Sequence, residues 1–361
     1  LLEAMQEQTV TVEGDSFGWG LGLRASGGQL VASALLKNNE QGGAYVFEDD
    51  GTGNWIETAI LHASDPNDGD RFGISASIWD DTVVVGAPFE DSSTTDVNSI
   101  PNENSNDSGA VFIFVKNGST WSQQAYLKPT LIGTIQANDN FGYSVAISAD
   151  TVVAGSPGES SSALVINGVP NENASFSGAA SIFVRTGTTW RQQAYLKPAA
   201  VGSTQTGDTF GHTVAIAGDL VAVGAIGESS SSTGINSIPN ESAFQAGSAY
   251  VFVRNAATWS QQAYLKPALI GSTQLGDQFG FSVAASGNTV VAGAPYEDGS
   301  STGVNSAANE NASSSGAVSI FRGLGMVMTS LSRTSAPASG AADITFGAPG
   351  FASVSWVGNV L

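Results

Sequence analysis

The sequence is poor in the residues that most catalytic centres and metal sites use. Its 361 residues include no cysteine and two histidines, His62 and His212. The absence of cysteine excludes disulfides, thiolate zinc sites and a cysteine nucleophile. Two histidines leave little material for a histidine-based metal centre or a general-base network. Neither histidine has a nucleophile partner visible in the sequence, so we predict that the protein is not an enzyme.

Positive charge is scarce as well. The chain has 12 Lys and Arg against 32 Asp and Glu, a net charge of −20. Phosphate binding needs Lys and Arg, so this balance argues against a nucleic-acid partner. No stretch approaches the roughly 18 apolar residues that span a bilayer, so no membrane span is expected. The acidity favours solubility and suits an extracellular or saline setting. The chain starts at Leu1 rather than Met, as we expect of a processed or cropped protein.

What the sequence has in abundance is repetition. The pair Phe-Gly recurs at Phe17, Phe72, Phe141, Phe210 and Phe279, in steps of 55, 69, 69 and 69 residues. Within each unit, short segments that alternate large and small side chains are separated by Gly, Asn and Ser. This alternation is the pattern of β-strands joined by turns.

Each full unit contains four such segments. In the third unit they are 141–147, 151–157, 178–184 and 190–196. Four strands in a repeat of this length predict an all-β protein, a β-propeller built from four-stranded antiparallel blades. The first strand carries large side chains on one face and small ones on the other. We therefore expect the large face of one blade to pack against the small face of the next.

The strand count predicts five blades. Five units supply three strands each, and fourth strands begin at Trp55, Trp121, Trp190 and Trp259. No fourth strand follows Phe321, but a strand-like piece, residues 2–12, precedes the first Phe-Gly. We expect this N-terminal strand to close the last blade, because closure removes open sheet edges. The alternative is part of a six- or seven-bladed ring. The expected domains are the propeller, 1–322, and a C-terminal β-rich tail, 323–361.

The loops between second and third strands are the first candidate site. They span 20 residues each, 89–108, 158–177, 227–246 and 296–315, and ordered loops of this length are usually functional. Their oxygen-bearing side chains keep a common register, and this density of hard ligands suits Ca²⁺. The alternative is that they cap turns inside self-packed loops. The candidate ligands are Glu90, Asp91, Asn98, Asn102, Glu103, Glu159, Asn167, Asn171, Glu172, Glu228, Asn236, Asn240, Glu241, Glu297, Asp298, Asn305, Asn309 and Glu310.

Other recurring polar residues have structural interpretations. An aspartate stands two residues before every Phe-Gly, at Asp15, Asp70, Asp139, Asp208 and Asp277. These carboxylates could form a cation site, but a turn that launches the strand explains their recurrence better. His212 occupies an apolar position of the repeat and is expected to be packed. Lysines end three of the fourth strands; we expect them to be spread around the disc rather than to form a substrate clamp.

The repeat resembles a known family. Phe72-Gly73 followed by Gly86-Ala87-Pro88, and Phe279-Gly280 followed by Gly293-Ala294-Pro295, are similar to the FG-GAP repeat. That family includes the N-terminal β-propeller of integrin α subunits and bacterial surface proteins. The resemblance implies extracellular ligand binding or adhesion, often with calcium. The family's aspartate-rich calcium loop in the first hairpin is missing here. In the tail, segments 331–340 and 343–351 resemble the start of an immunoglobulin-like TIG domain.

Three functions remain open from the sequence. The leading hypothesis is a secreted or cell-surface adhesion module, stabilised by calcium, that binds a protein or glycan ligand through the long loops. The alternative is a structural subunit of a surface layer or filament, in which self-association is the function. The second alternative is a polysaccharide-active enzyme such as a lyase, because propellers host many functions.

Overall fold

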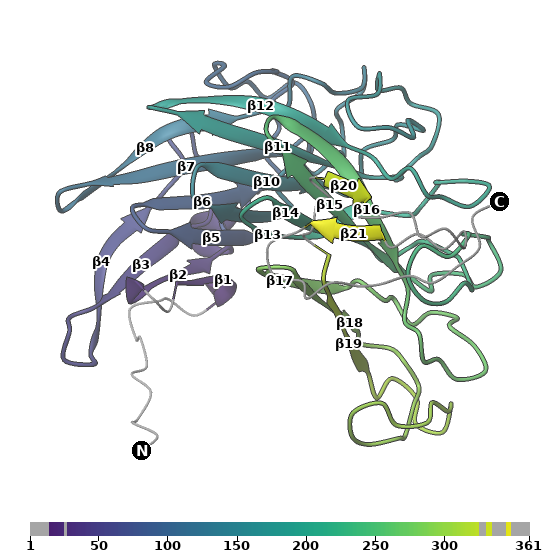
Figure 1. Cartoon of the computed structure of the whole chain (residues 1–361). Helices are drawn as coiled ribbons and strands as arrows, with labels where there is room; N and C mark the ends of the chain where they lie inside the picture. Colours follow the sequence, from purple (N-terminus) through teal and green to yellow (C-terminus); the bar gives the residue numbers. More distant parts are fainter. Residues whose placement is uncertain (1–13, 25–26, 325–329, 334–343, 348–361) are drawn as a thin grey trace.

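The computed structural model describes residues 14–24, 27–324, 330–333 and 344–347 (Figure 1). Over this part the protein is all-β, and the blades follow one another around a common axis. Its one helical segment there, α1 (Lys37–Glu40), has positive φ at Asn38 and Asn39 and is closer to a turn than to a helix. No helix of the described part is long and apolar enough to cross a membrane.

Four of the five blades are four-stranded antiparallel sheets whose strands follow one another in chain order, as predicted. The first three blades are β1 (Phe17–Arg24), β2 (Gln29–Ala34), β3 (Ala44–Asp49) and β4 (Trp55–Leu61); β5 (Ser75–Trp79), β6 (Thr82–Ala87), β7 (Ala110–Asn117) and β8 (Thr120–Leu127); and β9 (Ser144–Ser148), β10 (Thr151–Ser156), β11 (Ala179–Thr186) and β12 (Thr189–Leu196). The fourth is β13 (Phe210–Ala217), β14 (Leu220–Ala225), β15 (Ser248–Asn255) and β16 (Thr258–Leu265).

The fifth blade shows three strands among the described residues, β17 (Ser282–Ser286), β18 (Thr289–Ala294) and β19 (Ala317–Arg322). The N-terminal segment 2–12, which is expected to supply its fourth strand, lies outside the described residues. In the tail, β20 (Ser330–Arg333) and β21 (Ile344–Gly347) pair antiparallel. Most of the segments that resemble a TIG domain also lie outside the description.

Hydrophobic side chains gather between successive blades rather than inside any one of them. One cluster joins Val111 and Ile113 of the second blade to Phe141, Val145 and Ile147 of the third, all of them buried. Similar clusters lie between the other neighbouring pairs. The large side chains of β5, β9, β13 and β17 thus cover the preceding blade, as the alternation predicts. The internal blades therefore depend on their neighbours to bury these side chains.

The Phe-Gly pair is the joint between blades. Phe141 donates its N–H to the carbonyl oxygen of Ser108 in the preceding blade, at 3.0 Å. Gly142, with φ of 88°, then passes so close to Ala110 that a Cβ would overlap its carbonyl oxygen. Only glycine combines this positive φ with so close an approach. In this blade the strand starts at Ser144, three residues later than the alternation predicts, whereas β13 begins at Phe210 as predicted.

In the second, third and fourth blades a second glycine (Gly86, Gly155 and Gly224) receives the Phe-Gly joint of the following blade, whereas the first blade has Ser33 there, whose hydroxyl donates to the carbonyl oxygen of Gly73. A Cβ on Gly155 would overlap the carbonyl oxygen of Gly211, whereas at the same repeat position of the fifth blade, Gly293, it would meet only the Ser282 side chain of its own sheet. We predict that Gly155→Ala lowers the free energy of unfolding by about 3 kcal/mol or more, because backbone must move. Gly293→Ala, the matched control, is expected to cost less than about 1 kcal/mol. Urea unfolding of dilute protein measures both; equal losses contradict the joint.

Candidate functional site

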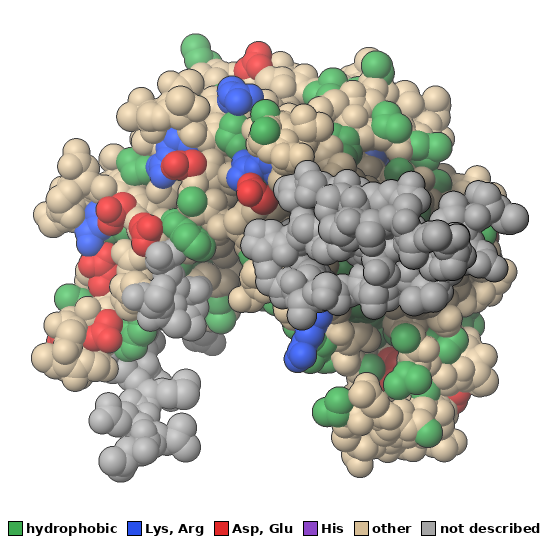
Figure 2. All heavy atoms as spheres, in the orientation of Figure 1, with side chains coloured by type: hydrophobic (Ala, Val, Ile, Leu, Met, Phe, Trp, Pro, Cys, Tyr) green, Lys and Arg blue, Asp and Glu red, His purple; other side chains and the backbone are tan. Residues whose placement is uncertain are grey.

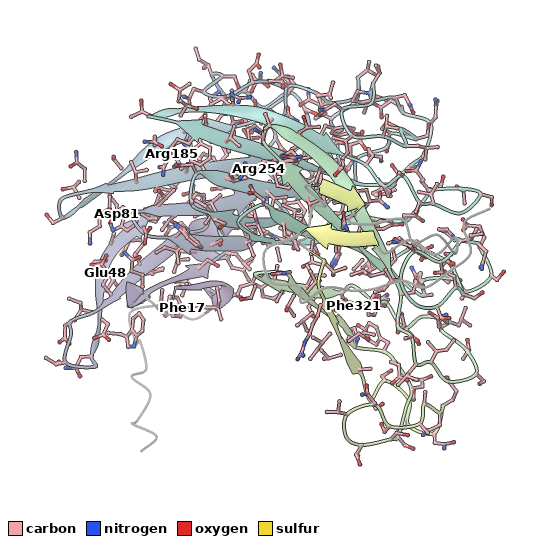
Figure 3. All side chains as sticks on the ribbon, in the orientation of Figure 1. Phe17, Glu48, Asp81, Arg185, Arg254 and Phe321 are labelled. Carbon is pink, nitrogen blue, oxygen red and sulfur yellow. The ribbon has the colours of Figure 1, made fainter. Side chains whose placement is uncertain are left out.

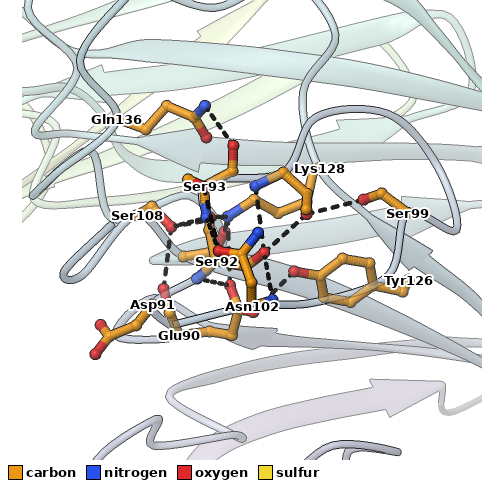
Figure 4. Close-up of polar contacts among 12 residues, drawn as sticks. Glu90, Asp91, Ser92, Ser93, Ser99, Asn102, Ser108, Tyr126, Lys128 and Gln136 are labelled. Atoms are coloured by element: carbon orange, nitrogen blue, oxygen red, sulfur yellow. Dashed lines mark hydrogen bonds and ion pairs between the residues drawn. The ribbon is translucent and has the colours of Figure 1, made fainter. Parts of the chain in front are cut away.

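The long loops are held from beneath by buried ion pairs. Glu90 Oε2 lies 3.3 Å from Lys128 Nζ, and both side chains are almost fully buried. Lys128 also donates to the carbonyl oxygens of Ser92 and Gly109, at 2.6 and 2.7 Å, and to Ser108 Oγ, at 2.8 Å (Figure 4). The other Glu90 oxygen accepts the Tyr126 hydroxyl, at 2.8 Å. The lysine thereby ties both ends of its loop to the end of the fourth strand.

The same pair recurs in the next two blades. Glu159 and Lys197, and Glu228 and Lys266, are also 3.3 Å apart and buried. Burial lowers the pKa of the three lysines and raises the pKa of Glu159 and Glu228, since charge is costly away from water. The sequence did not reveal this pairing. Its signal was the constant spacing of 38 residues between glutamate and lysine.

The first blade replaces the pair. At the position of the glutamate stands Lys37, which donates to the Tyr45 hydroxyl. At the position of the lysine stands His62, whose Nδ1 lies 3.4 Å from the carbonyl oxygen of Gly42. Gly42 occupies the position that Gly109 has in the second blade, where its carbonyl oxygen accepts a hydrogen bond from Lys128. Blade 1 also has a much shorter loop between its second and third strands, so there is less chain to anchor.

The other candidate ligands hold the loops in shape. Asn98, with φ of 58°, accepts the N–H of Tyr126 on its Oδ1 at 2.9 Å and donates its own N–H to the Tyr126 carbonyl oxygen at 2.7 Å. Asn167 and Asn236 make the same pair of contacts with their own fourth strands. Asn305 has the same positive φ. These asparagines fasten the middle of each complete loop to the sheet edge.

A second asparagine closes the neck of every long loop. Asn102 Oδ1 accepts the N–H and hydroxyl of Ser93, at 3.1 Å each, and the N–H of Asn104. Asn171, Asn240 and Asn309 repeat these contacts. Such side-chain to backbone bonds are the turn-capping alternative considered for the loops.

The acidic residues of the loops also accept protein N–H groups. Glu172 accepts the N–H of Ile135 in the linker before its blade, at 3.0 Å. Glu241 and Glu310 make the equivalent contact with Thr204 and Thr273. Four further carboxylates accept as well: Glu103 from the Asn67 side chain, Asp91 from the N–H of Asp107, Glu297 from the N–H of Gly299, and Asp298 from the N–H of Ser314. The loops are therefore braced to the linkers as well as to the strands.

The eighteen candidate calcium ligands thus fall into separate sets. In the described ranges, no three Asp, Glu or His side chains come together in a group that could hold a metal ion. The oxygens named above accept hydrogen bonds from the protein itself, an arrangement that does not fit a shared cation in the conformation seen here. Calcium binding stays a prediction from the sequence, and thermal unfolding with added calcium and with EDTA tests it.

The aspartates that precede Phe-Gly are buried beneath the loops. Asp139 donates its N–H to the carbonyl oxygen of Gln136 at 3.1 Å, as a turn requires. Its carboxyl is buried, and one oxygen has no partner within the described part. Burial, together with the nearby Glu159, raises the pKa of Asp139 to about 9. The same two causes raise the pKa of Asp70 to about 7, of Asp208 to about 8 and of Asp277 to about 6, with Glu90, Glu228 and Glu297 as the respective neighbours.

The other predicted features also have defined places. His212 lies between Tyr143 and Phe281, with ring centroids 5.3 Å apart on both sides, which confirms that it is packed. Burial lowers the pKa of His212. Arg185 and Arg254, which end third strands, lie between blades: Arg185 pairs with Asp150 and donates to Thr82 of the preceding blade at 3.1 Å, and Arg254 donates to Thr151.

The loops end in exposed aliphatic side chains. Ile100, Val169 and Ile238 occupy one repeat position, each followed by proline, and the fourth loop exposes Val304. These four, here called the tip residues, are between 84% and 93% exposed. Ile100 stands midway between Asn98 and Asn102, both of which are fixed by hydrogen bonds. Single exposed aliphatic residues are common, but the same exposure of Ile100, Val169 and Ile238 at one position of three loops forms a spaced array. Hydrophobic side chains are visible on the loop-bearing side in Figure 2.

Comparison with known proteins identifies the repeat. A family model described as FG-GAP repeat matches residues 55–114, 121–183, 190–252 and 259–321. Each match starts at the tryptophan of a fourth strand and ends in the third strand of the next blade, so the family unit spans a blade junction. No curated protein matches the chain.

The buried pair generates a stability prediction. Lys197→Met leaves Glu159 buried without its cation, so the free energy of unfolding should fall by about 3–5 kcal/mol. The double variant Lys197→Met/Glu159→Leu should recover much of this loss, because no charge is then left unpaired. Arg191→Met, at an exposed position, is the control and should change stability by less than about 0.5 kcal/mol. Urea unfolding measures the free energy of unfolding of all three variants. A double variant that is no more stable than Lys197→Met contradicts the coupling.

The buried aspartates generate a pH prediction. The pKa of Asp139 is raised on folding, so its contribution to stability is complete below pH about 4 and is lost as pH rises to about 9. Asp139→Asn, which mimics the neutral form, should match the natural protein near pH 4. At pH 9 it should be more stable by on the order of 3 kcal/mol. Asp96→Asn, at an exposed position, is the control. Thermal unfolding across pH measures the difference, and a gap that does not grow with pH contradicts the assignment.

Proposed function

The chain belongs to the FG-GAP repeat family, and from this we propose that it is an extracellular, non-enzymatic adhesion module that binds a protein ligand through its long-loop face. The observation that carries the proposal is the array of tip residues. Ile100, Val169 and Ile238 are exposed, while the loop below each of them is tied down by a buried lysine and by two asparagines. A surface that is rigid before binding loses little conformational entropy when a partner arrives.

The chemistry of the face favours a protein partner over a sugar. Ile100, Val169 and Ile238 offer aliphatic surface, and apolar anchors of this kind fill pockets on protein partners. The charge of −20 surrounds these anchors with negative potential, which attracts a basic ligand and speeds its encounter. Binding should therefore weaken as salt rises.

The titratable groups support a non-enzymatic role. The carboxyls with the most perturbed pKa values, those of Asp139, Asp208 and Asp70, are buried beneath the loops and paired or surrounded by protein. His212 is enclosed by two aromatic rings. A general acid or base must reach the proton that it transfers, and the three carboxyls are covered.

The tip residues provide the test. The triple variant Ile100→Asp/Val169→Asp/Ile238→Asp should lower affinity for the ligand by about 30-fold or more, because each tip loses about 1 kcal/mol of apolar contact. Its folding stability should stay unchanged, since the three side chains are exposed. Thr120→Asp/Thr189→Asp/Thr258→Asp adds the same charge at exposed positions of the hairpins at the other blade end and is the control.

The ligand is found on two arrays, one of extracellular matrix and cell-surface proteins and one of glycans. Surface plasmon resonance then compares the natural chain with both triple variants. A protein ligand lost only by the tip variant supports the proposal. Binding to glycans alone, binding that both variants retain, or no binding on either array contradicts it.

A further inference from the structure

The two ends of the blade series expose faces that are buried everywhere else. On β19, Val318 and Ile320 are exposed, whereas residues at the same positions of earlier blades, such as Val111 and Ile113, are fully buried. On β1, Trp19 and Leu21 are exposed. The exposed fractions of these four side chains lie between 60% and 69%. In Figure 3, Phe17 of the first blade and Phe321 of the fifth blade lie on either side of the opening between the two end blades.

The chain itself shows what covers such a face. At each internal junction the next Phe-Gly joint sits on it: Ser75 Oγ donates to the carbonyl oxygen of Gly142 at 2.8 Å, and Ser144 Oγ donates to that of Gly211 at 2.9 Å. The fifth blade has the same receiving face. Ser282 stands at the position of Ser75, and Gly293 stands at the position of the receiving glycine.

The first blade carries the matching Phe-Gly joint. Phe17-Gly18 is a Phe-Gly joint with the same positive φ at glycine, 89°. Among described residues, no atom lies within 4 Å of the place where a Cβ on Gly18 would be, whereas Gly142 and Gly211 pack against the preceding blade. The Phe-Gly joint of the first blade and the receiving face of the fifth blade therefore exist in one chain without contacting each other.

A row of aromatic rings leads to the same junction. Tyr143, His212 and Phe281 share one repeat position and stack from blade to blade at 5.3 Å. The row ends at Phe281, which is 40% exposed, and Trp19 occupies the same position of the first blade. A Trp19 ring set against Phe281 would extend the row by one step.

We propose that two copies of this chain bind head to tail, with the β1 face of one copy seated on the β17–β19 face of the other. A second copy is the occupant because both faces are exposed within one chain and because the junction repeats chemistry that the chain already forms at four blade junctions. The contact joins two different surfaces, so each copy keeps one free end and assembly continues until the rotation closes a ring, or forms a filament. This proposal does not depend on the loop-face ligand.

Two single variants each remove one end. Gly293→Ala should block the receiving face of the fifth blade. A Cβ at the equivalent Gly86 would overlap the docking carbonyl oxygen, whereas a Cβ on Gly293 meets only Ser282 within its own chain. Trp19→Asp should block the docking face of the first blade, and Trp19 is exposed within its own chain. Each variant should raise the dissociation constant of self-association by about 30-fold or more. Ile100→Asp, at a loop tip, is the control and should assemble like the natural chain.

Analytical ultracentrifugation of the full chain, with thermal unfolding to confirm that each variant folds, decides the matter. The natural chain should form oligomers that grow with concentration, and each end variant should stay monomeric. An equimolar mixture of Gly293→Ala and Trp19→Asp should form dimers and nothing larger, since each retains the complementary end. A natural chain that is monomeric at all concentrations, variants that still assemble, or a mixture that stays monomeric overturns the proposal.

Discussion

The constraint on which the structure depends is that every blade has two apolar faces and no way to cover them alone. The Phe-Gly joint meets this constraint by letting one backbone approach the next to within the radius of a missing Cβ. Large side chains such as Phe141 then fill the space against the preceding sheet. Stability is thus a property of junctions rather than of blades, as in other repeat proteins whose units contact only their neighbours.

The loop face is built on the same junctions. A buried lysine under each complete loop is costly, and the protein retains it with a glutamate and two backbone carbonyls. The result is a long loop whose two ends and middle are fixed while its tip projects into solvent. In blade 1, where the loop is short, His62 and Lys37 stand at these positions instead. In blades 2, 3 and 4, fixed loops and buried charge therefore occur together.

The sequence predicted the blades well because their signal is local. The alternation in 151–157 placed β10 to within one residue, and the glycine and asparagine turns separated the strands correctly. It could not identify Lys128 as the partner of Glu90, because that contact depends on the fourth strand ending beneath a loop that precedes it by 38 residues. The same glutamate was read as a metal ligand, since a carboxylate looks alike in both settings. Burial, which separates the two interpretations, is not written in the local pattern.

Junction chemistry also connects the two proposals. Each head-to-tail contact would repeat the step between neighbouring blades, so the loops of a second copy would continue on the same side as those of the first. Ile100, Val169 and Ile238 would then recur along an assembly, and a ligand with several binding sites would meet many weak anchors at once. An adhesion module and a structural subunit are therefore not opposed for this fold. The proposed binding surface and the proposed assembly surface lie at different parts of the blade, so assembly would strengthen adhesion without any new contact at the loop tips.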